Sequence, residues 1–80
     1  MYFVYVLYSK EFERNYVGMS EDVNRRLRQH NSGMVQSTKA FKPWELIYTE
    51  KFDSRVETRK REKYLKSAAG RRWRKNNLGM

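Results

Sequence analysis

Eighty residues predict one small domain, spanning residues 1–80. The absence of cysteine excludes disulfides and thiolate metal sites and suits a reducing, cytoplasmic location. The formal net charge is +9 and is unevenly placed: residues 55–75 contain ten basic and two acidic residues, whereas residues 1–54 contain eight and seven. This asymmetry favours a polyanionic partner, most simply nucleic acid, over a basic surface that serves only solubility.

The first residues predict a buried strand. Residues 2–8 are apolar at both alternating sets of positions, which is typical of a central strand covered on both faces. This apolar run is too short for a membrane span and lacks the basic stretch of a signal peptide, so no membrane association is expected. After a polar turn over residues 9–15, Tyr16-Val17-Gly18 begins a second strand that we expect to pair antiparallel with the first.

The middle of the chain predicts a helix and then a third strand. Ser20 is placed to cap a helix over residues 21–30, and Gly33 supplies its C-terminal stop. An irregular polar stretch runs to Pro43, and residues 44–52 carry the β-favouring side chains of a third strand.

The basic C-terminal part predicts further helices. Ser54 and Glu57 form a capping box that opens a helix to about Ala69. Gly70 is expected to break this helix, and residues 71–77 are expected to form a short basic helix after it. The elements together predict an α+β domain with a three-stranded antiparallel sheet flanked by two to three helices.

Helical geometry separates the arginines of the first helix. At ~100° per residue, Val23, Leu27 and His30 share the face toward the sheet. Arg26 lies within ~60° of this stripe, whereas Arg25 points ~160° away, toward water. At the rim, an arginine can hold a phosphate oxygen with two donors or cover the core edge with its aliphatic stem. His30 is either a proton relay at the same site or a histidine satisfied within the core.

Glu62 lies on the core-facing stripe of the second helix, together with Thr58 and Leu65. A carboxylate in that position needs a cation nearby. The cation is either a metal ion or a basic side chain of the same helix, such as Arg59 or Lys66.

Two strand motifs and the residues after them resemble the GIY-YIG nuclease family. Phe3-Val4-Tyr5 stands for the first motif and Tyr16-Val17-Gly18 for the second, and both keep the tyrosine. Tyr5 precedes Tyr16 by eleven residues; Arg26 follows ten residues later and His30 four after that, which matches the family spacing. The resemblance covers nearly the whole chain and is closest to the small stand-alone members.

The resemblance implies the roles of the site residues. Tyr5 and Tyr16 orient the attacking water or accept its proton, and which tyrosine is the base stays open. Arg26 steadies the scissile phosphate, and His30 is a candidate proton shuttle. The helix motif around Glu62 implies that this carboxylate holds one divalent ion, Mg²⁺ or Mn²⁺.

The function predicted from these observations is that of a metal-dependent endonuclease acting on DNA, in repair or recombination, with RNA left open as a substrate. The alternative is a non-catalytic nucleic-acid-binding module that retains the fold. In either case, basic side chains of the C-terminal part are expected to bind the phosphate backbone: Arg59, Lys63, Lys66, Arg71, Arg72, Arg74 and Lys75. The sequence leaves open whether a further protein targets the domain to its substrate.

Overall fold

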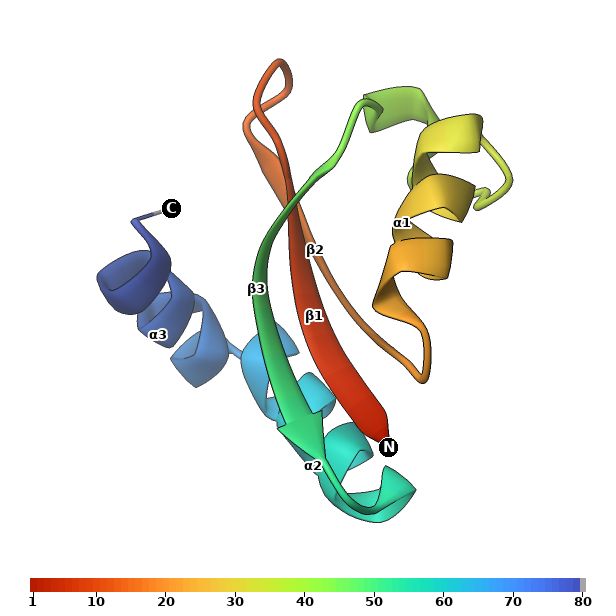
Figure 1. Ribbon diagram of the computed structural model, residues 1–80. Coiled ribbons are helices and arrows are strands. Elements are labelled where there is room, and N and C mark those ends of the chain that lie inside the picture. Colours follow the sequence, from red (N-terminus) through yellow and green to blue (C-terminus); the bar gives the residue numbers. More distant parts are fainter. Residues whose placement is uncertain (80) are drawn as a thin grey trace.

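The computed structural model describes residues 1–79 and contains a three-stranded antiparallel sheet with helices on both faces (Figure 1). Strands β1 (Tyr2–Ser9), β2 (Arg14–Ser20) and β3 (Glu45–Phe52) lie in the order β2-β1-β3. Helix α1 (Val23–Ser32) packs on one face, and α2 (Arg55–Lys66) and α3 (Ala68–Leu78) pack on the other. A short 3-10 helix, η1 (Lys39–Phe41), precedes β3. The predicted α+β architecture is confirmed.

Strand β1 is buried on both of its faces. Tyr5 and Leu7 belong to an apolar cluster with side chains of α1, whereas Val4 and Val6 pack with Leu65 of α2 on the opposite face. All four β1 side chains are at most 1% exposed. The strand therefore supplies two cores at once, as the apolar character of both of its faces predicted.

Strands β2 and β3 form the two edges of the sheet, and the pairing of β1 with β3 contains one irregularity. The β1–β3 ladder shifts register between Val6 and Leu7, so that Ile47 is an extra residue on β3.

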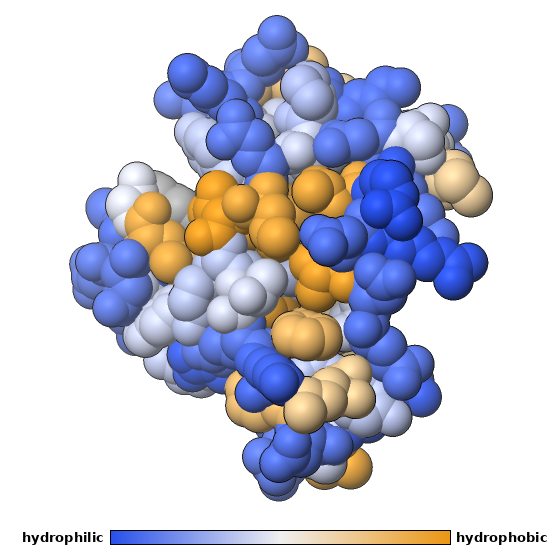
Figure 2. Space-filling view, in the orientation of Figure 1, coloured by the Kyte–Doolittle hydropathy of each residue, from blue (hydrophilic) through white to orange (hydrophobic). Residues whose placement is uncertain are grey.

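Figure 2 shows hydrophobic side chains gathered in the middle of one face and hydrophilic ones around them, as expected where a small core reaches the surface. None of the helices within residues 1–79 has the length and apolar character that a membrane crossing requires.

The start of α1 differs from the prediction. Asp22, not Ser20, caps this helix, because its Oδ1 accepts a hydrogen bond from the Arg25 amide at 3.0 Å. The Ser20 hydroxyl instead bonds the backbone of Asp22, at 3.0 Å to the carbonyl and 2.9 Å to the amide. Gly33 ends the helix with a φ of 83°, a left-handed conformation that glycine adopts without a steric cost.

The prediction that Gly70 breaks a helix is wrong. Helix α2 already ends at Lys66, and the Ser67 hydroxyl caps α3 by accepting from the Gly70 amide at 3.2 Å. Gly70 lies inside α3, where a Cβ atom would overlap the carbonyl oxygen of Tyr64 and the Cα of Leu65. The missing side chain thus allows α3 to pack directly against the end of α2.

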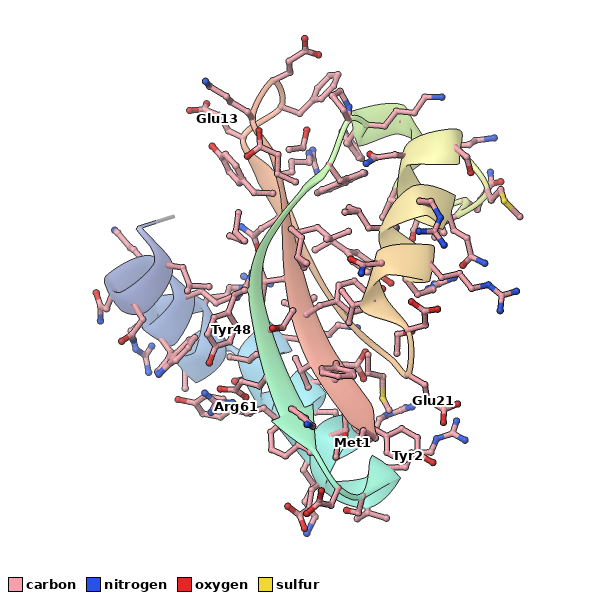
Figure 3. All side chains as sticks on the ribbon, in the orientation of Figure 1. Met1, Tyr2, Glu13, Glu21, Tyr48 and Arg61 are labelled. Carbon is pink, nitrogen blue, oxygen red and sulfur yellow. The ribbon has the colours of Figure 1, made fainter. Side chains whose placement is uncertain are left out.

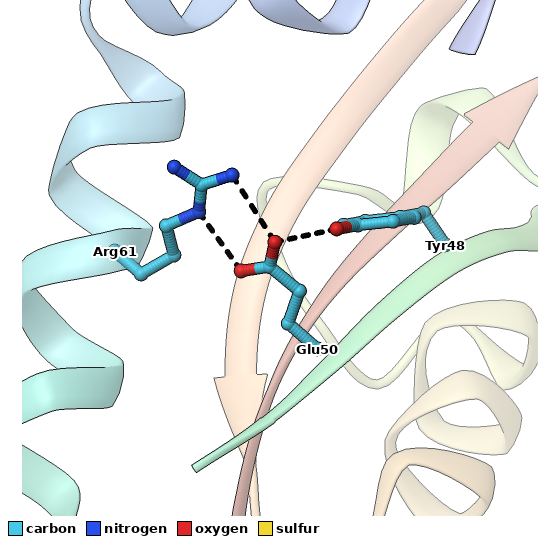
Figure 4. A network of polar contacts seen from close by, with 3 residues as sticks. All are labelled: Tyr48, Glu50 and Arg61. Carbon is cyan, nitrogen blue, oxygen red and sulfur yellow. Dashed lines mark hydrogen bonds and ion pairs between the residues drawn. The ribbon is translucent and has the colours of Figure 1, made fainter. Parts of the chain in front are cut away.

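A polar cluster fastens α2 to β3 and α3. Arg61 donates two hydrogen bonds to Glu50, from Nε at 2.8 Å and from Nη2 at 3.1 Å, and Tyr48 donates to the same carboxylate at 2.5 Å (Figure 4). The Arg61 guanidinium also lies 4.9 Å from the centre of the Trp73 ring. Bidentate charge-assisted hydrogen bonds and stacking on an indole are geometrically specific. The cluster therefore fixes the rotation of α3 about its axis.

We expect Gly70→Ala to lower the free energy of unfolding by roughly 2–3 kcal/mol or more, because the added methyl group must displace the backbone of α2. Gly79→Ala is the control. Its φ is 70°, but no other described heavy atom lies within 4 Å of the added Cβ, so only backbone strain of about 1 kcal/mol is expected. Chemical denaturation measures both costs, and equal losses would contradict the close packing of α2 on α3.

Candidate active site

The phenol of Tyr5 lies inside the domain, in a hydrogen-bonded chain with His30 and Thr38. Tyr5 Oη is 3.0 Å from His30 Nε2, and His30 Nδ1 is 2.8 Å from Thr38 Oγ1. All three residues are at most 1% exposed. The long contact from Thr38 Oγ1 to the Val35 carbonyl, at 3.4 Å, favours the tautomer in which His30 donates from Nδ1 to Thr38. Nε2 then carries the lone pair, and Tyr5 donates to it.

The protonation states follow from burial. Burial, with the nearby Arg26 guanidinium, lowers the pKa of His30 to about 4. The imidazole is therefore neutral near pH 7, with Nε2 able to accept a proton. Burial raises the pKa of Tyr5, and Arg26 offsets part of that rise. The phenol therefore keeps its proton at neutral pH.

Gly18 provides the space in which the Tyr5 ring lies. The two residues are paired across β1 and β2, and a Cβ atom at Gly18 would stand 2.5 Å from Tyr5 Oη and 3.0 Å from Tyr16 Cε2. The ring centroids of Tyr5 and Tyr16 are 6.3 Å apart, and those of Tyr16 and His30 are 4.8 Å apart. Glycine at this position therefore lets both tyrosines and the histidine gather in one cluster.

Arg26 lies at the rim of this cluster. It is partly buried whereas Arg25 and Arg28 are exposed, as helical geometry predicted. Its Nη1 donates to Gln29 Oε1 at 2.8 Å, and its charge acts on both Tyr5 and His30. Within residues 1–79 it forms no ion pair with a carboxylate. The guanidinium is therefore available to an anion.

Glu62 approaches the cluster from α2, in the opposite helical layer. Its side chain is 12% exposed and forms ion pairs with Lys66 at 3.3 Å and Arg59 at 3.8 Å. The predicted alternative of an ion pair on the same helix is therefore present. The negative charge of Glu62 also contributes to the raised pKa of Tyr5, so the carboxylate is within electrostatic reach of the phenol.

A pocket of about 300 Å³ adjoins Glu62 at the end of β2 and has Glu21 in its lining. Tyr2, which also lines it, and Glu21 lie at the same end of the sheet (Figure 3). The part of the chain that the structure describes has no group of three or more His, Cys, Asp or Glu side chains placed to hold a metal. Mg²⁺ needs only one or two carboxylates beside water and substrate phosphate. Glu62 fits such an ion as a single ligand.

The basic side chains predicted to bind nucleic acid fall into separate groups. Arg59 and Lys66 flank Glu62, and Lys66 Nζ lies 5.9 Å from the centre of the Tyr16 ring. The others lie on the exposed side of α2 or on α3: Lys63, Arg71, Arg72, Arg74 and Lys75. The first group adjoins Glu62 and the Tyr16 ring.

Two polar residues at the site were not singled out from the sequence. Thr38 orients the His30 ring, but it lies in a segment without periodicity, and its burial arises only from tertiary packing. Gln29 orients Arg26 from three positions along the same helix, a spacing that could have indicated the pair.

We expect stability to fall as pH decreases through the window between the ordinary His pKa of about 6.5 and the His30 pKa of about 4. The unfolded chain binds a proton at the upper end of this window and the folded chain only at the lower end, so stability rises with pH. His30→Gln, which can still bond Tyr5 and Thr38, should reduce this pH dependence by up to roughly 3 kcal/mol. Urea denaturation of the wild type and of His30→Gln at a series of pH values measures this difference. If the two proteins showed the same dependence of stability on pH, a buried neutral imidazole at His30 would be contradicted.

Comparison with known proteins identifies the family of this chain. A family model described as the GIY-YIG catalytic domain matches residues 1–77. UPF0213 proteins of Natronomonas pharaonis and Staphylococcus saprophyticus are 37% and 33% identical over 67 residues, covering 82% of this chain and 78% and 80% of those proteins. The solution NMR structure of the UPF0213 protein BH0048 from Bacillus halodurans matches with 31% identity and a TM-score of 0.54, over 91% of this chain and 81% of that one. The chain belongs to the GIY-YIG domain family, a family of nucleases.

Proposed function

We propose that this protein is a metal-dependent endonuclease that hydrolyses phosphodiester bonds in DNA. The observation that carries the proposal is the chain from Tyr5 through neutral His30 to Thr38, beside the Arg26 guanidinium. It supplies a proton acceptor and an anion-binding group at one place, which hydrolysis of a phosphodiester requires. Family membership alone does not fix an activity, whereas these groups supply the required chemistry.

The hydrogen-bond direction suggests a route for the proton. As the attacking water gives its proton to Tyr5 Oη, the phenol gives its own proton to His30 Nε2. Because burial raises its pKa, the phenol stays protonated near neutral pH and can accept a proton only as it gives up its own, for which His30 Nε2 is the acceptor in hydrogen-bond contact. Burial is the larger cause of the low His30 pKa, and a phosphate held by Arg26 would offset only the smaller contribution of the Arg26 charge. Tyr16 is left to orient water or phosphate.

Glu62 is the residue proposed to hold the divalent ion, Mg²⁺ or Mn²⁺. Held by Glu62, such an ion would supply positive charge against the negative charge on the phosphate and on the leaving oxygen. The ion pairs of Glu62 do not oppose this role, because its partners Arg59 and Lys66 have side chains that are 61% and 51% exposed. Ion pairs with exposed partners contribute little free energy and are readily exchanged.

Incubation with labelled linear, branched and single-stranded DNA, in Mg²⁺, Mn²⁺ or chelator, tests the proposal. Metal-dependent cutting of one or more of these substrates supports it. Binding to all of them without cutting would favour the non-catalytic nucleic-acid-binding module instead.

We expect Glu62→Gln to abolish cleavage and to leave DNA affinity in chelator equal or slightly higher, because the neutral amide weakens metal binding and frees Arg59 and Lys66. Glu57→Gln is the control, since it removes an exposed acidic group from the first turn of the same helix. Cleavage assays and fluorescence anisotropy give the two readouts. Wild-type cleavage by Glu62→Gln would show that this carboxylate is not the metal ligand.

A second comparison uses neighbouring arginines of α1. Arg26→Ala should lower the cleavage rate by roughly 10²-fold or more, in line with the loss of one group that stabilises transition-state charge. Arg25→Ala removes the same charge from an exposed position and should change the rate little. Single-turnover rates at saturating DNA measure both, and equal losses would mean that the arginines act only through general charge.

A further inference from the structure

Arg74 of α3 is a buried cation without a counter-charge. Arg74 is 7% exposed, and the Nε atom of its side chain is buried without a hydrogen-bond partner among the residues described. None of the ion pairs formed within residues 1–79 includes Arg74. A buried Nε–H that lacks an acceptor is costly, since its lost hydration is not replaced. Such a group is unusual unless a ligand supplies the missing acceptor.

The side chain lines a pocket that carries more positive charge. Asn15 of β2 and Arg71 and Lys75 of α3 complete the lining, and the volume is about 260 Å³. Neither Arg71 nor Lys75 has a carboxylate partner among residues 1–79. Burial and the neighbouring Arg71 charge both lower the pKa of Arg74. The pocket is smaller than most sites for drug-sized ligands and suits a single anionic group.

Two features of the fold hold Arg74 in this position. Gly70, one turn earlier on the same side of α3, allows the helix to approach the end of α2 closely. Trp73 is stacked against Arg61, which fixes the rotation of α3. The pocket is therefore lined by a constrained side chain, that of Arg74, whereas Arg72, two residues earlier on the same helix, is exposed.

We propose that Asn15, Arg71, Arg74 and Lys75 form a phosphate-binding pocket that holds the backbone of the nucleic-acid substrate at the β2 edge. This inference rests on the proposed function, because the nucleic acid that the pocket would hold is the proposed substrate. Asn15 directly precedes Tyr16 on the edge strand β2, so the two side chains lie on opposite faces of the same sheet edge. The guanidinium can offer paired donors to one phosphate, and the Asn15 amide can add a third. A phosphodiester supplies the acceptor that Arg74 lacks and offsets the repulsion between the three cations.

Arg74→Met tests the pocket, and Arg72→Met is the charge-matched comparison on the same helix. Fluorescence anisotropy with a labelled single-stranded oligonucleotide, in chelator so that nothing is cut, should show affinity about 10-fold or more weaker for Arg74→Met, in line with one charge-assisted contact. The loss for Arg72→Met should be several-fold smaller. Equal losses of affinity in Arg74→Met and Arg72→Met would overturn the proposed phosphate-binding pocket.

Thermal unfolding supplies the second readout. Arg74→Met should unfold at the same or a higher temperature than the wild type in chloride, because a buried unpaired charge is replaced by an apolar side chain of similar length. Inorganic phosphate at matched ionic strength should raise the melting temperature of the wild type and of Arg72→Met, but not that of Arg74→Met. A lower melting temperature for Arg74→Met in chloride would show that Arg74 is structural and would overturn the proposal.

The remaining outcomes separate this pocket from the proposed chemistry. A phosphate-dependent shift without oligonucleotide binding would overturn the proposal in favour of a site for a small free anion. Oligonucleotide binding that depends on Arg74, in a wild-type protein that cuts no DNA with Mg²⁺ or Mn²⁺, would support the pocket while overturning the nuclease.

Discussion

Strand β1 has no side that faces solvent, and the arrangement of the rest of the domain follows from this. Because side chains alternate along a strand, one segment of eight residues supplies the apolar surface on which α1 packs and also the surface on which α2 and α3 pack. The same alternation places Tyr5 under α1, opposite Gly18. A shift of one residue in register would exchange the two faces, and it would destroy the cores and the tyrosine cluster together.

Most of the regular elements could be predicted from the sequence because their signals are local. The apolar run at the start, the capping box at Ser54 and the glycine at position 33 each act within a few residues. Gly70 was misinterpreted because its role is not local. Its backbone is compatible with helix, and what requires glycine there is the approach of Tyr64 and Leu65. No propensity argument contains that contact.

In the candidate site, too, the features with a local sequence signal could be predicted and those that depend on tertiary contacts could not. Helical periodicity identified the partly buried Arg26 among exposed neighbours, because a helix presents its faces at fixed angles. Thr38 and the buried position of Arg74 could not be found in this way. Both depend on how an irregular segment or the last helix packs against the rest of the domain, which is determined by tertiary contacts and not by local sequence.

The ion pairs of Glu62 have a consequence for cooperativity. In this structure one carboxylate neutralises two cations, Lys66 beside the Tyr16 ring and Arg59 one turn earlier on α2. A divalent ion that takes the carboxylate releases both side chains, which then attract a polyanion more strongly. Linkage is reciprocal, so a polyanion that engages Arg59 and Lys66 frees Glu62 and tightens binding of the ion by the same factor. Under the proposed function, cation and polyanion would therefore bind together more readily than either one alone.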